Sequence, residues 1–193
     1  MSKLETNQVD PSTGTTLTLG TSGDTIAIPS GVTIANSGTA TGFGGAMTPA
    51  FHANLSANQT VSNNTDTKVQ FDTEVLDTDG CYDNSSNYRF TPTTAGKYFV
   101  YVMGAGLSDT TYKLNVYNIA IYKNGSAYRQ TNTTVNGADI LNEHNAVCTA
   151  VIDMNGSSDY VEAYSRVNVT TGTGSIDARS ASGGFGAYRI VGV

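Results

Sequence analysis

Residues 97–107 have the sequence KYFVYVMGAGL, which alternates with the period of two that is typical of a β-strand. Both faces of this predicted strand carry large apolar or aromatic side chains: Tyr98, Val100 and Val102 on one face, and Phe99, Tyr101 and Met103 on the other. Residues 113–123, KLNVYNIAIYK, have the same property. There the alternating sets are Leu114, Val116, Asn118, Ala120 and Tyr122 on one face, and Asn115, Tyr117, Ile119 and Ile121 on the other. Two long strands of this kind predict a β domain.

A strand that is apolar on both faces must bury each of its two faces against other parts of a protein. In a two-layer sandwich each sheet buries one face against the other sheet, so the outward face of such strands stays uncovered within one chain. A second copy of the chain is the cover that we predict, because tyrosine is favoured at interfaces where one end of the ring stays wet. The alternative is that exposed tyrosines are an ordinary feature of this β surface.

The rest of the chain from Pro49 onward also alternates in short stretches. Seven further strands are predicted, at residues 50–55, 68–76, 88–91, 127–133, 145–154, 160–169 and 184–191. Turn dipeptides that favour hairpins separate several of them: Asp79-Gly80, Asn124-Gly125, Asn136-Gly137 and Asn155-Gly156. No segment has the periodicity of an amphipathic helix, so the sequence predicts an all-β sandwich or jelly roll.

Residues 1–45 differ from the rest and form a predicted N-terminal segment, followed by a head at residues 46–193. Apolar residues occur in this segment as spaced pairs: Leu17 and Leu19, Ile26 and Ile28, and Val32 and Ile34. Strands with only two inward side chains are too short to bury a core alone. Two interpretations are open: a flexible tail rich in Ser, Thr and Gly, or a fibrous β stem in which several copies share a narrow apolar core. The regular spacing favours the stem.

The composition argues against several classes of partner. Ten Lys and Arg residues against sixteen Asp and Glu residues give a net charge of −6, whereas proteins that bind nucleic acids or anionic membranes need basic patches. No apolar run approaches the roughly 18 residues of a membrane span, and the first residues lack the apolar segment of a secretory signal. We therefore expect no nucleic-acid partner, no membrane insertion, and synthesis in a cytoplasm.

Few residues offer chemistry for catalysis. His52 and His144 are isolated, and the sequence has no nucleophile elbow, zinc-binding helix motif or phosphate-binding glycine loop. Cys81 and Cys148 lack metal-ligand spacing, and Cys148 lies in an apolar run where a buried thiol is the ordinary outcome, although pairing of the two is an alternative. We therefore expect no enzyme activity.

One short loop carries three carboxylates: Asp77, Asp79 and Asp83, in the sequence LDTDGCYD at residues 76–83. Oxygen clusters of this kind suit calcium, which makes this loop the candidate calcium site. The spacing lacks the closing Glu of helix-loop-helix calcium sites, so a solvated turn is the alternative. No other cofactor is expected.

Five stretches resemble the globular head of complement component 1q, whose jelly roll is shared with tumour necrosis factor. They are PAFHANLS at residues 49–56, KVQFDTEVLDTDGCYD at 68–83, YRFTPTTAGKYFVYV at 88–102, IYKNG at 121–125 and FGAYRIVGV at 185–193. The resemblance implies a ten-stranded jelly-roll sandwich that assembles as a homotrimer above a fibrous stalk. The collagen stalk of the animal proteins has no counterpart here, because the chain has no Gly-X-Y repeat.

The opening residues MSKLETNQVDPSTGTTLTLG are similar to the starts of tail-fibre and structural proteins of marine bacteriophages. This similarity, added to the stem and head, implies a phage virion protein made in the bacterial cytoplasm: a trimeric fibre that residues 1–45 anchor to other virion proteins. The candidate ligand of its projecting head is a host-surface glycan or receptor, contacted by tyrosines and by the loops at residues 132–142 and 170–182. The alternatives are a capsid decoration protein that stabilises the shell, and a secreted ligand-binding module.

Seven residues are predicted to pack the core or the contacts between subunits: Phe51, Tyr98, Val100, Tyr101, Tyr117, Phe185 and Tyr188. Most of them are aromatic, and aromatic side chains dominate the buried area of cores and interfaces. An interface of about 800 Å² per partner is ordinary for a stable assembly.

Overall fold

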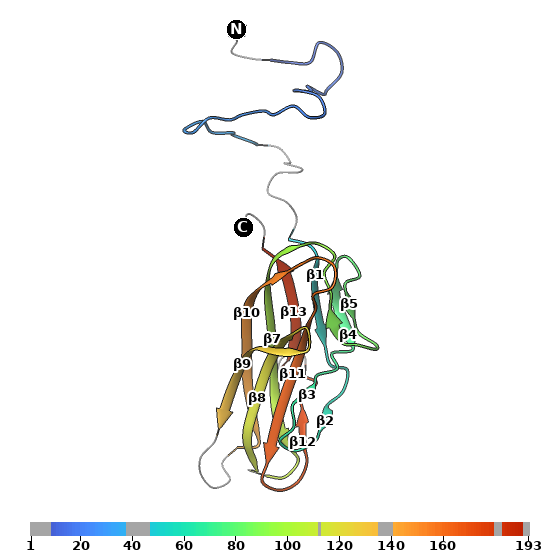
Figure 1. The fold of residues 1–193 in the computed structure, drawn as a ribbon, viewed down its shortest axis with the longest axis vertical. Coiled ribbons are helices and arrows are strands. Elements are labelled where there is room, and N and C mark those ends of the chain that lie inside the picture. Colours follow the sequence, from blue (N-terminus) through green and yellow to red (C-terminus); the bar gives the residue numbers. More distant parts are fainter. Residues whose placement is uncertain (1–8, 38–46, 112, 135–140, 180–182, 191–193) are drawn as a thin grey trace. The chain divides into compact units, whose positions relative to one another are not determined.

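Two antiparallel sheets pack against each other in the computed structural model (Figure 1). The structure describes residues 9–37, 47–111, 113–134, 141–179 and 183–190. These residues form thirteen strands and no helix, which confirms the predicted all-β fold class. Accordingly, no described segment is a helix long and apolar enough to cross a membrane.

Sheet A is built around β7, whose length allows three strands to pair with it. Its strands are β1 (Ala50–Asn54), β2 (Gln59–Val61), β4 (Thr73–Asp77), β7 (Gly96–Ser108), β10 (Glu143–Met154), β12 (Gly174–Ile176) and β13 (Gly184–Arg189). β10 lies along one edge of β7, while β13 and β12 follow each other along the opposite edge. β1 and β4 continue the sheet beyond β13, and β2 continues it beyond β12.

Sheet B is narrower and is built around the β8–β11 pair. Its strands are β3 (Thr67–Lys68), β5 (Tyr82–Asp83), β6 (Arg89–Phe90), β8 (Leu114–Lys123), β9 (Ser126–Thr134) and β11 (Val161–Val169). β9 forms one edge, and β6 and β3 pair with different parts of β11 on the other side. The predicted strand at residues 68–76 is therefore two strands, because the chain leaves sheet B after Lys68 and enters sheet A at Thr73.

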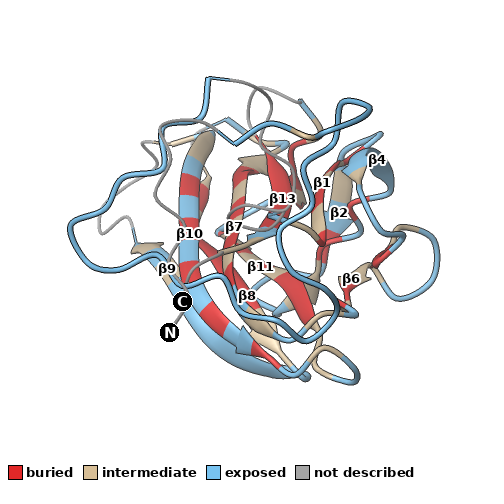
Figure 2. Ribbon diagram, turned by 90° about the horizontal axis from the view of Figure 1, so that it is seen from above, coloured by how far each residue is buried: buried red, intermediate tan, exposed pale blue. Residues whose placement is uncertain are grey.

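The alternation of side chains along the long strands fills the space between the sheets. Along β10 the buried residues are Ala146, Cys148, Ala150, Ile152 and Met154, and the residues between them are exposed (Figure 2). At one end of the core Phe51 stacks on Tyr82 and Phe90 with ring centroids 4.5 and 4.6 Å apart, and Phe185 meets it edge-on at 4.9 Å. Cys81 and Cys148 are both buried and free.

Tyr117 of β8 occupies the space that two glycines of β7 leave open. A Cβ atom at Gly106 would lie 2.3 Å from Cδ2 of Tyr117, and one at Gly104 would lie 2.7 Å from its hydroxyl oxygen. The GAG sequence in β7 is therefore the reason that a tyrosine ring fits between the two sheets at this level.

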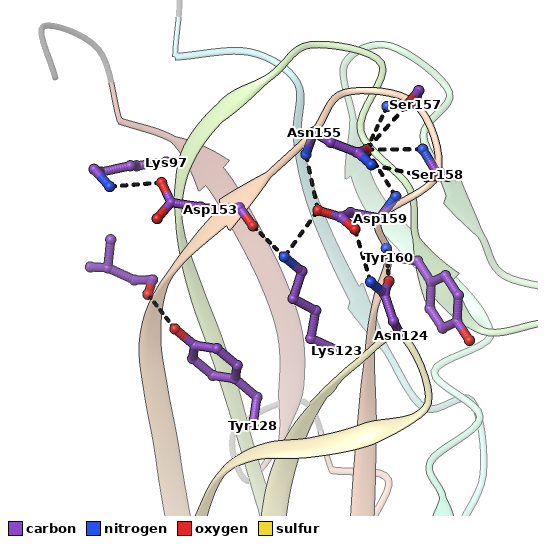
Figure 3. A network of polar contacts seen from close by, with 11 residues as sticks. Lys97, Lys123, Asn124, Tyr128, Asp153, Asn155, Ser157, Ser158, Asp159 and Tyr160 are labelled. Atoms are coloured by element: carbon purple, nitrogen blue, oxygen red, sulfur yellow. Dashed lines mark hydrogen bonds and ion pairs between the residues drawn. The ribbon is translucent and has the colours of Figure 1, made fainter.

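Side chains of sheet B close the open edge of sheet A. They donate hydrogen bonds to carbonyl oxygens of β10: Thr131 to Val147 at 2.8 Å, Tyr128 to Val151 at 3.3 Å, and Lys123 to Asp153 at 2.7 Å. Figure 3 shows the last two bonds beside Asp159, which also accepts from Asn124 at 2.8 Å. Occupied carbonyls make β10 a poor template for pairing with another strand.

The chain divides into two units, Met1–Thr41 and Gly42–Val193. In the first unit the described residues 9–37 are largely irregular, with short turns and no strand, whereas the sequence predicts short strands there. The physical reason is that a single chain offers these segments no second backbone with which to pair. The predicted boundary at residue 45 lies outside the described residues.

Candidate self-association face

The outward side of sheet A carries a group of large apolar side chains, called here the outer face of sheet A. Its members are Leu76 from β4, His52 from β1, Tyr188 from β13, Phe99, Tyr101 and Met103 from β7, and Val147 and Val151 from β10. The Leu, the two Val and Tyr188 are between 38% and 53% exposed, and the others are half-buried. Exposed apolar side chains that gather on one face indicate an interaction surface.

Strand register places these side chains in three rows across the sheet. The rows are Leu76–His52–Gly186–Tyr101–Thr149, Ala50–Tyr188–Phe99–Val151, and Gly184–Met103–Val147. Directly opposite residues on one face have Cβ atoms about 5 Å apart, so side chains within a row are neighbours, as the rings of Phe99 and Tyr188 are with centroids 5.4 Å apart. None of the twelve residues in these rows is Asp, Glu, Lys or Arg.

Two glycines of β13 make room for the rings in the middle of this face. A Cβ atom at Gly186 would lie 2.3 Å from the hydroxyl oxygen of Tyr101, and one at Gly184 would lie 2.6 Å from Cε1 of His52. Both rings therefore lean over β13, with their centroids 5.9 Å apart. The Tyr101 hydroxyl oxygen and Nδ1 of His52 are 2.9 Å apart, which is hydrogen-bond distance.

Partial burial keeps both members of this pair neutral. Burial lowers the pKa of His52 below its ordinary value of 6.5, and a contact with Asn54 offsets this only in part. Burial also raises the pKa of Tyr101, and the neighbouring Tyr188 adds to the rise. The hydrogen bond between the Tyr101 hydroxyl and Nδ1 of His52 joins two neutral groups, so the middle of the face presents a bonded, uncharged pair.

Ion pairs lie at both ends of the neighbouring strands β7 and β10, beyond the apolar rows. Where β7 begins, Nζ of Lys97 lies 2.7 Å from the carboxylate of Asp153. Where β10 begins, the guanidinium of Arg179 lies 2.5 Å from Asp177 and 2.6 Å from Glu143. An apolar centre with a charged rim has the layout of a protein–protein interface.

The outward side of sheet B, called here the outer face of sheet B, is occupied by side chains that satisfy one another. The rings of Tyr122 and Tyr164 stack with centroids 3.9 Å apart. The guanidinium of Arg166 donates two hydrogen bonds to the carboxylate of Asp66, at 2.8 and 2.6 Å. Of the two strands with large side chains on both faces, β7 therefore has the open apolar face, while much of the outward side of β8 is covered within the chain.

The seven predicted packing residues divide between the core and the outer face of sheet A. Five lie in the core and are at most 2% exposed: Phe51, Tyr98, Val100, Tyr117 and Phe185. Tyr101 and Tyr188 lie on the outer face. The alternation of residues 97–107 places Phe99 and Met103 there too, but sequence reasoning missed His52 and its glycine neighbours. The available signal was the glycine spacing of GFGAYR, because glycine inside a strand marks the close approach of another group.

Two of the three predicted calcium ligands, Asp77 and Asp83, accept hydrogen bonds from the backbone of their own turns. The Asp77 carboxylate accepts a hydrogen bond from the backbone N–H of Tyr82 at 2.8 Å. The Asp83 carboxylate accepts one from Ser86 at 2.9 Å, and this bond is the largest cause of the strongly lowered pKa of Asp83. Asp79 is exposed. Within the described part of the chain no three His, Cys, Asp or Glu residues are placed to hold a metal, so calcium stays a prediction.

The described parts of the two predicted ligand loops lie at the same end of the head. Leu141 and Asn142 accept hydrogen bonds from the backbone of Leu114 and Ser108, at 3.0 and 2.9 Å. Thr173 donates its N–H to Asp109 at 2.7 Å. Residues 135–140 and 180–182 of these loops lie outside the described residues. No ligand chemistry follows from the parts that are described.

Comparisons with known proteins support the fold alone. No protein-family model and no curated protein matches the sequence. The solved structures with similar folds include murine APRIL at pH 5.0 (TM-score 0.54, 12% identity) and at pH 8.0 (0.52, 11%), each covering 73% of this chain and 98% of the other. The structure of Eiger TNF from S. frugiperda matches with a TM-score of 0.51 and 12% identity over 73% of this chain and 91% of that one. The head is therefore a jelly roll similar to those of the tumour necrosis factor family.

Proposed function

We propose that the chain is a non-enzymatic structural protein whose head assembles as a homotrimer through the outer face of sheet A. The observation that carries the proposal is the set of uncharged, largely apolar rows on this face, with Phe99, Tyr101 and Tyr188 at their centre. Covering such a surface gains about 25 cal/mol for each Å² of apolar area. The number three comes from the resemblance to complement component 1q heads, and a ring of three requires this face to meet a different surface of the next copy.

The N-terminal segment supports the same assembly. Its six paired apolar residues are between 44% and 62% exposed in a single chain: Leu17, Leu19, Ile26, Ile28, Val32 and Ile34. A turn separates the first two pairs, in which Thr21 donates its N–H to the carboxylate of Asp24 at 2.7 Å. Three copies that wind together would give each pair a shared core, which is the β stem that the spacing favours.

We further propose that this trimer is a phage virion fibre, anchored by residues 1–45 and displaying the head to the host surface. The similarity of the first twenty residues to marine phage structural proteins and the net charge of −6 support this context. A capsid decoration protein is the second candidate, since the same trimeric head and anchor would suit a shell surface.

The mass in solution tests the assembly. Light scattering at micromolar concentration is expected to give three times the chain mass of 20.2 kDa. A mass of one chain would overturn self-association, and a mass of two chains would overturn the threefold arrangement.

A pair of matched variants tests the location of the contact. Val151→Asp places a carboxylate on the outer face of sheet A and is expected to yield monomers, because a buried unpaired charge is strongly unfavourable at an interface. Ala127→Asp places the same group on the exposed side of β9, opposite Tyr122 on sheet B, and is expected to leave the trimer intact. A trimer in Val151→Asp together with monomers in Ala127→Asp would show that the copies meet through sheet B instead.

Binding experiments separate the two virion roles. Purified protein is incubated with host cells and with capsids that lack decoration. Binding to cells supports the fibre, whereas binding to capsids with a rise in shell stability supports the decoration protein. Binding to neither would overturn the virion proposal while leaving the trimer in place.

A further inference from the structure

We propose that the head carries a binding site for a neutral pyranose sugar, in a hollow between residues 55–59 and residues 70–72 beside Tyr88. The hollow has a volume of about 210 Å³. Pockets for drug-sized ligands measure about 300–1,000 Å³, so this one suits a single ring with its substituents. The site is formed within one head and uses none of the residues of the outer face of sheet A.

Tyr88 is held in a backbone conformation that a tyrosine rarely adopts. Its φ is 50°, in the left-handed region that favours glycine or asparagine. The preceding residue is fixed from two sides: Asn87 donates its side-chain amide to Asp83 at 2.6 Å, and its carbonyl accepts from Nζ of Lys68 at 3.1 Å. The chain thus keeps a bulky aromatic residue at a position where glycine would be unstrained. Strain of this kind concentrates at binding sites.

The polar wall of the hollow is fixed by its own hydrogen bonds. The carboxylate of Asp72 accepts from the backbone N–H of Ser56 at 2.7 Å and from its hydroxyl at 2.5 Å. The side-chain amide of Gln59 donates to the carbonyl of Lys68 at 2.9 Å and accepts from the N–H of Gln70 at 2.9 Å. These bonds hold the two segments together, so a ligand would meet a preorganised surface.

The groups that line the hollow select for a neutral polyol. Carboxylate oxygens of Asp72 accept hydrogen bonds from hydroxyl groups, and the side-chain amides of Asn58 and Gln70 both donate and accept. An aromatic ring such as that of Tyr88 packs against the C–H face of a sugar ring. None of the described lining residues is Lys or Arg. Phosphates and acidic sugars would therefore lack a cationic partner here.

The charge of Asp72 strengthens this selection. Burial is the largest single influence and opposes its ionisation, but the hydrogen bonds from Ser56, from Thr73 and from its own backbone together outweigh burial and lower its pKa. An ionised carboxylate repels anions and makes stronger hydrogen bonds to hydroxyl groups than a neutral acceptor does.

The test uses the full chain and three probes: the methyl α-pyranosides of glucose, galactose and mannose. Backbone amide NMR is expected to show saturable shifts at Ser56, Gln70, Asp72 and Tyr88 with at least one probe, with Kd in the millimolar range, and none with glucuronic acid. No saturable shift with any of the three pyranosides would overturn the proposal. Equal shifts with glucuronic acid would overturn the selection for neutral sugars.

Variants separate binding from folding. Tyr88→Gly removes the ring and relieves the strained φ, so we expect at least tenfold weaker binding with an unchanged or higher melting temperature. Gln70→Ala removes an exposed amide that has no partner among the described side chains, and a severalfold loss is expected. The control Tyr128→Ala removes a 49% exposed ring from sheet B and should leave binding unchanged. Binding that survives both hollow variants would place the sugar elsewhere. Light scattering on the same samples reports trimer formation independently.

Discussion

The outer faces of sheets A and B contain strands with the same sequence pattern but differ in how far their large side chains are covered. β7 and β8 both alternate large side chains on two faces, yet only the outer face of sheet A stays open. The difference comes from the neighbouring strands. β11 supplies Tyr164 and Arg166, which stack or pair across the outer face of sheet B. β13 supplies Gly184 and Gly186, which leave the rings of sheet A uncovered. The side chains of the neighbouring strands thus decide whether a strand with large side chains on both faces leaves an apolar surface for another copy of the chain.

The largest effect is expected from placing a side chain at Gly186, in the space that the Tyr101 ring occupies on the outer face of sheet A. In Gly186→Val the new side chain would collide with Tyr101 and with the Phe51 carbonyl, 2.3 and 2.8 Å from the position of its Cβ. We expect the free energy of unfolding to fall by about 2–3 kcal/mol, measured by urea denaturation. Thr149→Val replaces a hydroxyl by a methyl group at an exposed neighbour of Tyr101 and should change stability by less than about 0.5 kcal/mol. Equal stability of the two variants would show that the rings are free to move aside.

A second prediction compares two tyrosine hydroxyls. Tyr101→Phe removes the hydroxyl that bonds to His52, which is expected to cost about 1 kcal/mol. Tyr117→Phe removes a buried hydroxyl that makes no well-formed hydrogen bond within the described residues beyond a contact with the Ser165 side chain, so we expect no loss or a gain of up to about 1 kcal/mol. Chemical denaturation of both variants measures the difference. A larger loss in Tyr117→Phe would reveal a partner for its hydroxyl.

The long strands were predictable because alternation alone defines them. β7, β8 and β11 begin and end within one residue of the predicted limits. Residues 68–71 also alternate, and Val69 and Phe71 are buried. Alternation does not show, however, that the hydrogen-bond partner changes from β11 to β1 beyond this stretch. The three-residue strands β2 and β12 are too short to give a pattern of their own.

The candidate sites were only partly predictable for a related reason. Phe99, Tyr101 and Met103 follow from one strand, but the hydrogen bond between His52 and Tyr101 needs β1 and β7 to lie on either side of β13. The hollow beside Tyr88 also depends on contacts between segments that are separate in the sequence, such as the bond between Lys68 and Asn87, which are 19 residues apart. Single-sequence patterns describe faces of strands, whereas sites arise from register between strands.

The outer face of sheet B offers a smaller test. Arg166→Ala breaks the two-point ion pair with Asp66, whose side chains are 40% and 37% exposed. We expect a loss of about 0.5–1 kcal/mol that shrinks at high salt, and an unchanged mass by light scattering. A double-mutant cycle with Asp66→Ala isolates the pair. A change of mass would show that this face also contacts another copy.

The smallest expected effect is a pH dependence located on the outer face of sheet A. Because folding lowers the pKa of His52 below 6.5, the unfolded chain binds more protons than the folded head near that pH. Stability is therefore full above pH 6.5 and falls as the pH drops through 6.5 toward the folded pKa. Solvent exposure limits the loss to about 0.5 kcal/mol or less.

Denaturation curves between about pH 7.5 and about pH 5, a window that spans the ordinary histidine pKa, measure this slope. His52→Gln should remove it, and Arg166→Ala on the other face should retain it. Trimer formation covers His52 further, which deepens the desolvation that lowers its pKa. The slope should consequently be steeper in the trimer than in the Val151→Asp monomer. An equal slope in both would mean that His52 stays in contact with water after assembly, and the contact between copies would then have to lie on other rows of this face.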